Sequence, residues 1–366
     1  MLRVLFCGGG SIGHIAPGVA VWEALRQKQQ ETKALFLCSQ RADDRSFLKR
    51  ANVPHRPIIA PKSAFGPSLL LFPILLPIAL FEALWTLLFF NPHVLFAKGG
   101  YVTVPVAIVA WMLGIPIVLH ESDAVLGRGN RFLLRFARHL CIGAPAKELE
   151  NGDIAARKGI MVTATGNPVR AAILRGSRDG GKRVTGFSGN RPILLVIGGS
   201  QGAEALNETV RVHLSTLLTL CEVIHLTGKG KVRAGRQHAR YFQREFANED
   251  LPDLLAVADL VVSRSGASAV AELAALGKAV VFVPIPGLAQ DHQGANARFL
   301  EVAQAAVILP QEKLKEEFLL TITQLIENAE KRKELGNRLK TFATPDAADR
   351  IANILLSEVQ EKISPP

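Results

Sequence analysis

Aromatic residues are scarce in this chain of 366 residues. Phenylalanine, tryptophan and tyrosine together make up 6% of it, and only two residues are tyrosine. Proteins that bind single-stranded nucleic acid by base stacking depend on such side chains. The spacing of cysteine and histidine typical of zinc fingers is also missing. The sequence therefore disfavours nucleic acid as a partner.

Cysteine is equally sparse, and its four copies lie far apart, mainly in or beside apolar runs: Cys7, Cys38, Cys141 and Cys221. No pair has the Cys-x-x-Cys spacing, so neither a disulfide framework nor a zinc site is expected. We predict buried, reduced thiols in a cytosolic protein. The pattern of a secretory signal peptide is missing too, because the short apolar run after Arg3 leads directly into glycines.

Acidic residues are outnumbered, 32 against 43 Lys and Arg, which gives a formal charge of +11. Such an excess calls for an anionic partner: nucleic acid, acidic lipid or a phosphorylated substrate. With nucleic acid disfavoured, the last two remain. The apolar fraction of 48% is typical of a globular chain, and the length predicts two domains.

Apolar runs alternate with helix-like segments along the whole chain. Strands are predicted in the first half at 2–7, 33–38, 93–97, 116–119, 139–142 and 160–164, and in the second half at 192–197, 221–226, 258–262, 279–283 and 305–308. Near-continuous apolar strands separated by helices are typical of parallel sheets covered on both faces. The predicted fold class is therefore α/β, with two doubly wound Rossmann-like domains. The stretch 166–191 holds the predicted linker, and a last amphipathic helix is expected over 345–362.

Each half contains a glycine-rich loop between a strand and a helix, at Gly8–His14 and Gly198–Ala203. Such loops leave backbone N–H groups unpaired at a helix start, which favours phosphate. We expect the two halves to face each other across one phosphorylated ligand. The first loop also fits the dinucleotide fingerprint, but the second strand ends without an acidic residue, so NAD is disfavoured.

A long apolar run extends from Ala64 to Phe90 with Glu82 as its single charge. It is long enough to span a bilayer, but its three prolines oppose a simple spanning helix. The alternatives are a transmembrane helix, a buried core helix and an exposed apolar patch. The patch is favoured because a helix that is apolar on nearly every side cannot hide entirely against one sheet. Phe81 and Trp85 would suit a membrane interface.

Four arginines follow at helical spacing, Arg128, Arg131, Arg135 and Arg138. On one predicted helix all four would share a face. A solvated face is the ordinary interpretation, but no acidic residue is interleaved, so an anionic membrane surface is favoured. Together with the apolar patch, this predicts a protein that lies on a membrane.

Three further segments carry candidate chemistry. His14 follows the first glycine loop and is a candidate base, or a group adjacent to phosphate. Glu272, one turn into the helix that follows Arg264-Ser265-Gly266, could bind both hydroxyls of a ribose. The polar cluster at Asp291–Asn296 could read sugar hydroxyls, and a metal site there is disfavoured because only one His and one Asp are close together.

Five motifs resemble, in order and spacing, the MurG family of peptidoglycan N-acetylglucosaminyltransferases: Gly-Gly-Tyr-Val at 99–102, His-Glu at 120–121, Thr-Gly-Asn-Pro-Val-Arg at 165–170, Gly-Gly-Ser-Gln-Gly-Ala at 198–203 and Arg-Ser-Gly-Ala at 264–267. The resemblance implies a GT-B fold with a cleft between two domains. It also implies inverting transfer of N-acetylglucosamine from UDP-N-acetylglucosamine to the muramyl sugar of lipid I, giving lipid II, without a metal or a cofactor. It places the protein in cell-wall biogenesis, cell shape and cell division.

The resemblance also assigns residues. The donor side comprises Ser11, Ile12, Gly13, Asp123, Arg170, Ser200, Gln201, Phe246, Ala247, Ala267, Ser268, Ala269, Val270, Ala271, Glu272, His292 and Gln293. Within this set, Arg170 and Ser200 would contact the diphosphate, and Glu272 the ribose. Tyr101 and Asn130 would line the acceptor side, with His14 or Asp123 as the catalytic base. The membrane patch would comprise Ile74, Leu75, Phe81, Trp85, Trp111, Arg128, Arg131 and Arg135.

The implied division places acceptor and membrane binding in residues 1–166, completed by 345–366, and donor binding in 167–344. The expected partners are UDP-N-acetylglucosamine, a polyprenyl-diphosphate muramyl-peptide lipid and an anionic membrane at the cytoplasmic face of the plasma membrane. Ile12 stands where the family has glycine, and isoleucine resists a positive φ. Three alternatives stay open: a transferase for another lipid acceptor, a UDP-sugar epimerase, and an inactive UDP-sugar-binding scaffold at the membrane.

Overall fold

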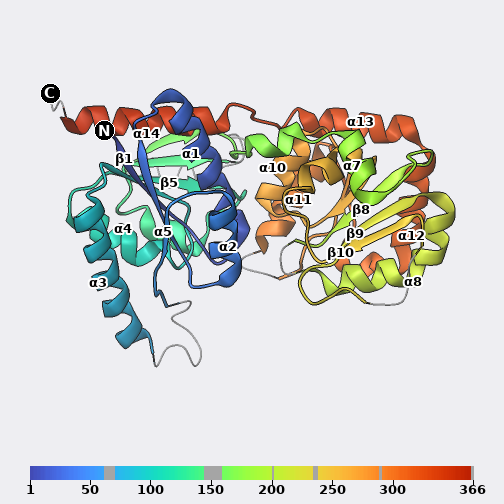
Figure 1. Ribbon diagram of the computed structural model, residues 1–366, viewed down its shortest axis with the longest axis horizontal. Coiled ribbons are helices and arrows are strands. Elements are labelled where there is room, and N and C mark those ends of the chain that lie inside the picture. Colours follow the sequence, from blue (N-terminus) through green and yellow to red (C-terminus); the bar gives the residue numbers. More distant parts are fainter. Residues whose placement is uncertain (62–70, 144–158, 200–201, 234–237, 288–290, 364–366) are drawn as a thin grey trace. The chain divides into compact units, whose positions relative to one another are not determined.

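The computed structural model describes residues 1–61, 71–143, 159–199, 202–233, 238–287 and 291–363, with side chains described as far as residue 360. It divides the chain into two units (Figure 1). Unit 1 comprises Met1–Arg170 and Thr344–Pro366, and unit 2 comprises Ala171–Ala343. The chain therefore leaves the first unit once and returns to it at its C-terminal end.

Unit 1 is built on a seven-stranded, wholly parallel sheet in the order β3-β2-β1-β4-β5-β6-β7. Its strands are β1 Arg3–Cys7, β2 Lys33–Cys38, β3 His55–Pro57, β4 Val94–Ala97, β5 Ile117–Glu121, β6 His139–Ile142 and β7 Met161–Ala164. Six of the seven were predicted from their apolar runs. The strand order reverses direction next to β1, which is the doubly wound arrangement.

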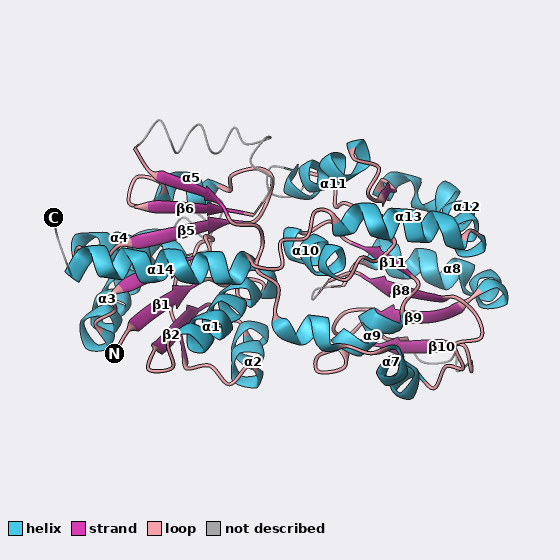
Figure 2. Cartoon of the chain, turned by 90° about the horizontal axis from the view of Figure 1, so that it is seen from above, coloured by secondary structure: helices cyan, strands magenta, loops and turns pink. Residues whose placement is uncertain are grey.

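Helices cover both faces of this sheet (Figure 2). One face packs against α1 Ala16–Lys28 and α14 Ala347–Ile363, with Trp22 and Leu355 in a shared core. The other packs against α3 Phe72–Phe90 and α4 Thr103–Met112. Two shorter helices complete the unit, α2 Ala42–Arg50 and α5 Arg128–Leu133. The predicted terminal helix is α14, and its apolar side lies on the first sheet.

Unit 2 repeats the design with six parallel strands in the order β10-β9-β8-β11-β12-β13. The strands are β8 Ile193–Ile197, β9 Glu222–Leu226, β10 Tyr241–Arg244, β11 Leu260–Ser263, β12 Val280–Phe282 and β13 Val307–Ile308. The helices are α7 Arg178–Thr185, α8 Glu204–Leu220, α9 Leu251–Val257, α10 Ala267–Ala275, α11 His292–Val302, α12 Leu314–Glu327 and α13 Ala329–Lys340. The predicted fold class, two Rossmann-like parallel sheets, is confirmed.

Two strands escaped prediction, β3 and β10, and each lies at an edge of its sheet. Their sequences, His-Arg-Pro and Tyr-Phe-Gln-Arg, are short and polar. An edge strand is covered less than a central one, so it needs no continuous apolar run, and proline is tolerated there. This explains why apolar runs did not reveal them.

Candidate active site

The first glycine loop joins β1 to a 3₁₀ turn at Ile12–His14, from which α1 follows. The left-handed conformation falls on Gly10, with φ +92°, whereas Ile12 opens the 3₁₀ turn and packs against the core. The expected conflict between an isoleucine and a positive φ therefore does not arise. A Cβ on Gly8 would lie 2.3 Å from the carbonyl oxygen of His14, so this position requires glycine.

The N–H groups of this loop are partly used inside the protein. Gly10 donates its N–H to Asp44 Oδ2 at 2.7 Å, and Gly8 donates to the carbonyl of Leu37 at 3.2 Å. Ser39 Oγ also donates to Asp44 Oδ2, at 2.6 Å. The expectation of unpaired N–H groups is therefore wrong for Gly8 and Gly10. The reason is Asp44, a fully buried carboxylate on α2 that needs donors of its own.

His14 is held by its own loop and remains partly exposed. Its Nδ1 lies 3.2 Å from the carbonyl oxygen of Gly9. Because a carbonyl only accepts, Nδ1 carries the proton and Nε2 presents a lone pair. Burial lowers the pKa of His14 and the positive charge of Lys98 lowers it further, while Asp123 and Glu121 oppose the change. The imidazole is thus a neutral base at physiological pH.

The motif at 99–102 lies against the first loop. Gly99 and Gly100 have φ +82° and +83°, and a Cβ on Gly100 would come within 3.1 Å of His14 Nδ1. The ring of Tyr101 lies 3.0 Å from the position that a Cβ on Gly10 would take. The structure therefore brings together two segments that the sequence singled out separately.

Two acidic residues lie at the end of β5, Glu121 as its last residue and Asp123 just after it. Glu121 is buried, and its carboxylate accepts from the N–H of Asp123 at 3.1 Å, the N–H of Gly127 at 2.9 Å and Asn130 Nδ2 at 2.9 Å. Asp123 itself is partly exposed. Asn130 is buried and orients Glu121, so its assignment to the acceptor side stays a prediction. The side chain of Glu121 was part of a motif, but sequence reasoning gave it no role.

The motif at 165–170 follows β7 and contacts the residues at the end of β5. His120 Nε2 lies 3.2 Å from the carbonyl oxygen of Gly166, and Asn167 Nδ2 donates to the carbonyl of Ser122 at 3.0 Å. The guanidinium of Arg170 lies over the ring of Phe47, 5.3 Å from its centre. Arg170 is the last residue of the first stretch of unit 1, and its contact with a diphosphate stays a prediction.

In unit 2 the second glycine loop lies between β8 and α8, and Ser200 and Gln201 are outside the described residues. Gly199 and Gly202 have φ +82° and +66°, and the N–H of Gly202 donates to the carbonyl of Gly199 at 2.9 Å. A Cβ on Gly202 would lie 2.2 Å from the carbonyl oxygen of Thr227, so Gly202 is packed tightly against the residue that follows β9.

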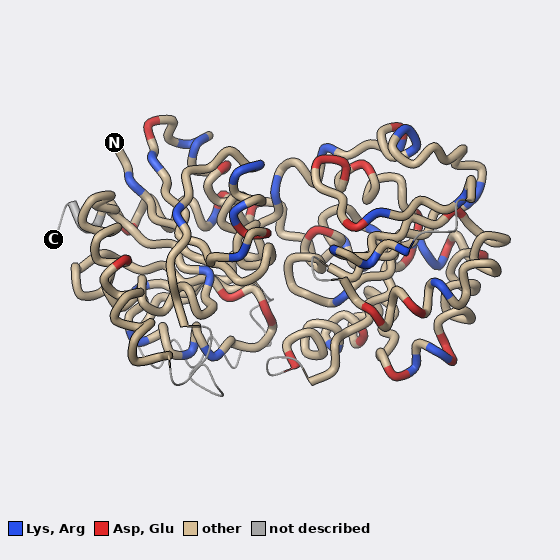
Figure 3. Tube along the Cα trace, turned by 60° about the horizontal axis from the view of Figure 1, so that its bottom comes forward, with Lys and Arg blue, Asp and Glu red and all other residues tan. Residues whose placement is uncertain are grey.

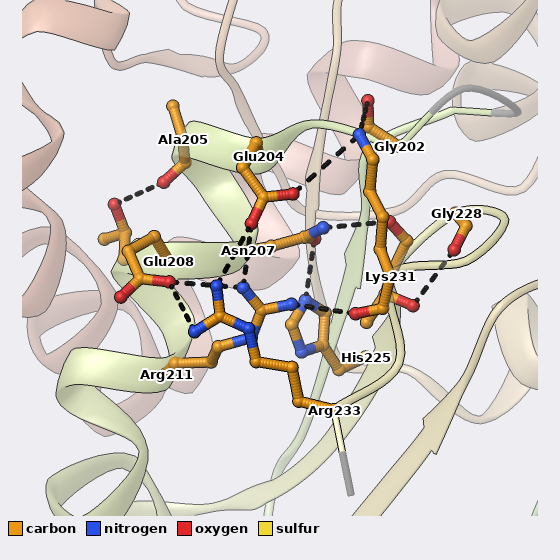
Figure 4. Close-up of polar contacts among 12 residues, drawn as sticks. Gly202, Glu204, Ala205, Asn207, Glu208, Arg211, His225, Gly228, Lys231 and Arg233 are labelled. Carbon is orange, nitrogen blue, oxygen red and sulfur yellow. Dashed lines mark hydrogen bonds and ion pairs between the residues drawn. The ribbon is translucent and has the colours of Figure 1, made fainter.

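A charged network fixes the helix that follows (Figure 4). Arg211 donates to Glu204 at 3.0 Å, to Glu208 at 3.2 Å and to the carbonyl of Lys231 at 2.8 Å. Lys231 Nζ in turn donates to the carbonyl of Gly202 at 3.4 Å. The network therefore ties Gly202 and the start of α8 to the segment after β9.

A buried chain of hydrogen bonds lies next to this network. Asn207 Nδ2 donates to the carbonyl of Thr227 at 2.9 Å, which leaves Asn207 Oδ1 to accept from His225 Nε2 at 3.0 Å. His225 Nδ1 then accepts from the hydroxyl of Tyr241 at 2.9 Å. Burial lowers the pKa of His225 to about 4, so this histidine is neutral.

His225 makes the free energy of unfolding of unit 2 depend on pH. Its pKa is about 4 in the folded chain and about 6.5 in an unfolded one. The unfolded state therefore binds more protons as the pH falls, and the free energy of unfolding of unit 2 should drop by about 1.6 kcal/mol between pH 6.5 and pH 5. This contribution is complete well above pH 6.5 and is lost as the pH falls toward 4.

Hydrogen exchange of the β8 and β9 amides, corrected for the pH dependence of intrinsic exchange, would measure the effect. His225→Gln should remove most of this drop, whereas His238→Gln, at an exposed position, should leave it unchanged. An equal drop in all three proteins would show that His225 does not cause it.

The segment 264–272 forms the third strand-to-helix turn, from β11 into α10. Gly266 precedes the helix, no side chain caps it, and a Cβ on Gly266 would meet no atom within 4 Å. The N-terminus of α10 therefore opens to free space and can receive an anion. Arg264 points elsewhere, because it donates to the carbonyl of Val283 at 2.9 Å and to Gln311 Oε1 at 2.7 Å.

The polar cluster at the start of α11 adjoins this turn. Ser265 Oγ donates to the carbonyl of Gln293 at 2.9 Å, and Asn296 Nδ2 donates to the carbonyl of Ser265 at 3.0 Å. Gln293 Oε1 accepts from the N–H of Ile285 at 3.2 Å. The structure thus places the predicted ribose and sugar segments side by side. Phe246 and Ala247 are partly buried in the segment that follows β10.

The apolar run corresponds to α3, and the part before residue 71 lies outside the described residues. Four residues of α3 are buried, all on one face: Ala79, Ala83, Thr86 and Leu87. Phe81, Trp85 and Phe89 are 64%, 49% and 71% exposed, and Trp111 on α4 is 55% exposed. A fully buried core helix is therefore excluded. By length and composition α3 could cross a membrane.

The arginine stripe is only partly as predicted. Helix α5 ends at Leu133, so Arg135 and Arg138 do not continue it. Arg138 lies directly before β6 and pairs with Glu358 of α14 at 2.8 Å. Arg128, Arg131 and Arg135 are exposed, and Arg135 lies over the ring of Phe132. The prediction of four arginines on one helical face is therefore wrong. Along the described chain as a whole, basic and acidic residues are interspersed (Figure 3).

Comparisons with known proteins cover nearly the whole chain. Residues 4–142 match the glycosyltransferase family 28 N-terminal domain, and residues 193–351 match the C-terminal domain. A UDP-N-acetylglucosamine–N-acetylmuramyl-(pentapeptide) pyrophosphoryl-undecaprenol N-acetylglucosamine transferase of Legionella pneumophila is 32% identical over 358 residues, 96% of each chain. The chain belongs to this transferase family. The resemblance to the family in the sequence motifs is thereby confirmed.

Solved structures agree with the family. The crystal structure of MurG from Acinetobacter baumannii matches 98% of this chain and 100% of that chain, with 27% identity and a TM-score of 0.71. A UDP-GlcNAc 2-epimerase from Neisseria meningitidis, bound to UDP-GlcNAc, gives a TM-score of 0.68 at 14% identity and covers 97% of this chain and 100% of that chain. The second likeness shows the fold alone.

Proposed function

We propose that the protein transfers N-acetylglucosamine from UDP-N-acetylglucosamine to the muramyl sugar of lipid I and so forms lipid II for peptidoglycan. The observation that carries the proposal is the relationship, over 96% of the chain, to transferases named for this reaction. His14 supports it, because a neutral imidazole with a lone pair on Nε2 is the base that such a transfer needs.

In the proposed reaction the acceptor hydroxyl attacks C1 of N-acetylglucosamine. A new bond forms between the acceptor oxygen and C1, and the bond from C1 to the diphosphate oxygen breaks. His14 Nε2 takes the hydroxyl proton, and UDP leaves with the bonding electrons. Asp123 is the second candidate for the base. The charge that grows on UDP is stabilised by N–H groups that are already oriented.

The donor would bind on unit 2. The space beside Gly266 at the N-terminus of α10 is open, and Gly202 packs tightly against Thr227, which suits a diphosphate at these two helix starts. Glu272, partly exposed on the second turn of α10, would take the ribose hydroxyls. His292 and Gln293 would meet the sugar, with Phe246 and Ala247 near the uracil. The predicted contacts of Ser200 and Arg170 with the diphosphate, and of Gln201 with the donor, are part of the same proposal.

The acceptor would bind on unit 1, near His14, Tyr101 and Asp123. We propose that the domain division follows these roles and that the protein lies on the cytoplasmic face of the plasma membrane. The exposed aromatic side of α3, Trp111 and the three exposed arginines would contact the lipid surface. A soluble UDP-sugar epimerase has no need of such a surface.

Turnover with labelled UDP-N-acetylglucosamine and lipid I tests the function directly. Labelled lipid II and released UDP in equal amounts would support the proposal. Labelled product with a diacylglycerol instead of lipid I would favour another lipid acceptor, and an altered UDP-sugar without lipid would favour an epimerase. Binding of both substrates without product would indicate an inactive scaffold.

The membrane surface has its own prediction. The triple variant Phe81→Ser, Trp85→Ser, Phe89→Ser should bind vesicles containing phosphatidylglycerol at least about tenfold more weakly, because each large apolar side chain contributes about 1.5–3 kcal/mol when buried. Co-sedimentation measures this. The matched control is Val302→Ser with Leu320→Ser, two exposed apolar positions on unit 2. Equal loss in both proteins would count against α3.

A further inference from the structure

Lys98 is a buried lysine directly after β4, and neither the motifs nor the proposed reaction gives it a role. Its side chain is only 5% exposed. The backbone N–H of Lys98 donates to the carbonyl of Cys7 at 2.9 Å, which fixes Lys98 beside β1. The side-chain Nζ donates to the hydroxyl of Ser122. A buried ammonium is costly unless other groups balance its charge.

Lys98 lies at the end of β4 that faces the first glycine loop. Lys98 and His14 line the same small cavity together with Phe36 and Phe96. The cavity offers about 10 Å³, room for no more than about one water molecule. A Cβ on Gly8 would lie 3.2 Å from Cβ of Lys98, so the lysine stem packs directly against the first glycine loop.

The groups that balance the charge of Lys98 are acidic: Glu121 is the last residue of β5, and Asp123 lies two residues later. Burial lowers the pKa of Lys98, and the carboxylates of Glu121 and Asp123 oppose this by favouring its charged form. The same two carboxylates favour protonation of His14. The positive charge of Lys98 acts on His14 in the opposite sense.

Two further titratable neighbours, His120 and Cys7, carry no charge at neutral pH. Burial lowers the pKa of His120 far below its ordinary range and raises the pKa of Cys7 to about 12. The charge of Lys98 therefore offsets the charges of these two carboxylates.

We propose that Lys98 is a positioning residue of the transfer reaction, whose buried ammonium offsets Glu121 and Asp123 and keeps His14 in the neutral form that can accept a proton. This rests on the proposed function in that His14 is taken as the base. Without Lys98, two carboxylates would act on the imidazole unopposed. His14 would then hold a proton over part of the working pH range and could not take one from the acceptor.

The test compares two neutral variants with a charged one. Lys98→Met removes both the charge and the hydrogen bond, whereas Lys98→Gln removes the charge and keeps a donor for Ser122. Ser122→Ala removes the hydrogen bond and keeps the charge. In both lysine variants we expect the midpoint of His14 titration, followed by NMR of labelled histidine, to rise by about one pH unit or more. In Ser122→Ala it should stay close to the wild-type value.

The acidic limb of the kcat/KM profile should move to higher pH by the same amount. A fall in activity by one constant factor at every pH, with His14 titrating as in the wild type, would overturn the proposal. Because Lys98→Gln can replace the hydrogen bond, it covers the case in which Lys98→Met does not fold. The NMR midpoint does not depend on turnover. A shifted midpoint in a protein that forms no lipid II would therefore refute the proposed function and leave the link between Lys98 and His14 standing.

Discussion

Replacing His14 by alanine should lower kcat by roughly 100-fold or more, the usual cost of losing a general base. The Nδ1 bond to the carbonyl of Gly9 leaves Nε2 free to accept the hydroxyl proton, and alanine offers no such acceptor. The KM for the donor should change little, because the proposed donor residues lie mainly on unit 2. Steady-state turnover of UDP-N-acetylglucosamine with lipid I measures both constants.

Asp123→Asn is the matched comparison for this prediction, because Asp123 is the other candidate base. If His14 is the base, Asp123→Asn should lower kcat less than His14→Ala does. An unchanged kcat in His14→Ala would remove His14 from the mechanism. A much larger loss in Asp123→Asn would move the role to the carboxylate.

Gly202→Ala should weaken donor binding by at least about tenfold. The new Cβ would lie 2.2 Å from the carbonyl oxygen of Thr227 at a residue with φ +66°, so the loop between β8 and α8 has to move. Strain of this kind costs about 1–3 kcal/mol, and the displaced N–H groups lose their alignment on the diphosphate. Calorimetric titration with UDP measures the affinity.

Gly230→Ala is the matched control for Gly202. Its φ is +69°, but a Cβ there would meet no atom within 4 Å, so it carries the backbone strain without the collision. UDP should bind to Gly230→Ala with nearly the wild-type affinity. Equal weakening in both variants would mean that the packing of Gly202 against Thr227 is not what shapes the donor loop.

The sequence predicted the central strands because a strand buried on both faces must be apolar throughout, as Ile193–Ile197 is. It missed β3 and β10 because edge strands escape that requirement. It also treated Arg128 to Arg138 as one helix, since the spacing fits. The pairing of Arg138 with Glu358 joins residues 220 positions apart, which no local pattern reveals.

The sequence revealed the site positions that require glycine. It did not reveal the side chains whose hydrogen-bond partners lie far away along the chain. Gly10, Gly99 and Gly202 stand out because their conformations exclude other residues. By contrast, Asp44 takes the N–H of Gly10 from 34 residues away. The burial of Lys98 beside Ser122 depends on how β4 and β5 pair. A single lysine after an apolar strand carries no sign of such a role in the sequence.

We expect uridine diphosphate to bind to unit 2 at the start of α10, beside Gly266, and at the second glycine loop, beside Gly202. The most direct test of this central claim is a crystal structure of the protein soaked with uridine diphosphate. We expect the diphosphate at the N-termini of α8 and α10, with the ribose hydroxyls on Glu272. Well-ordered protein with no nucleotide at these two helix starts, or with nucleotide bound at another place, would contradict the proposed donor site on unit 2.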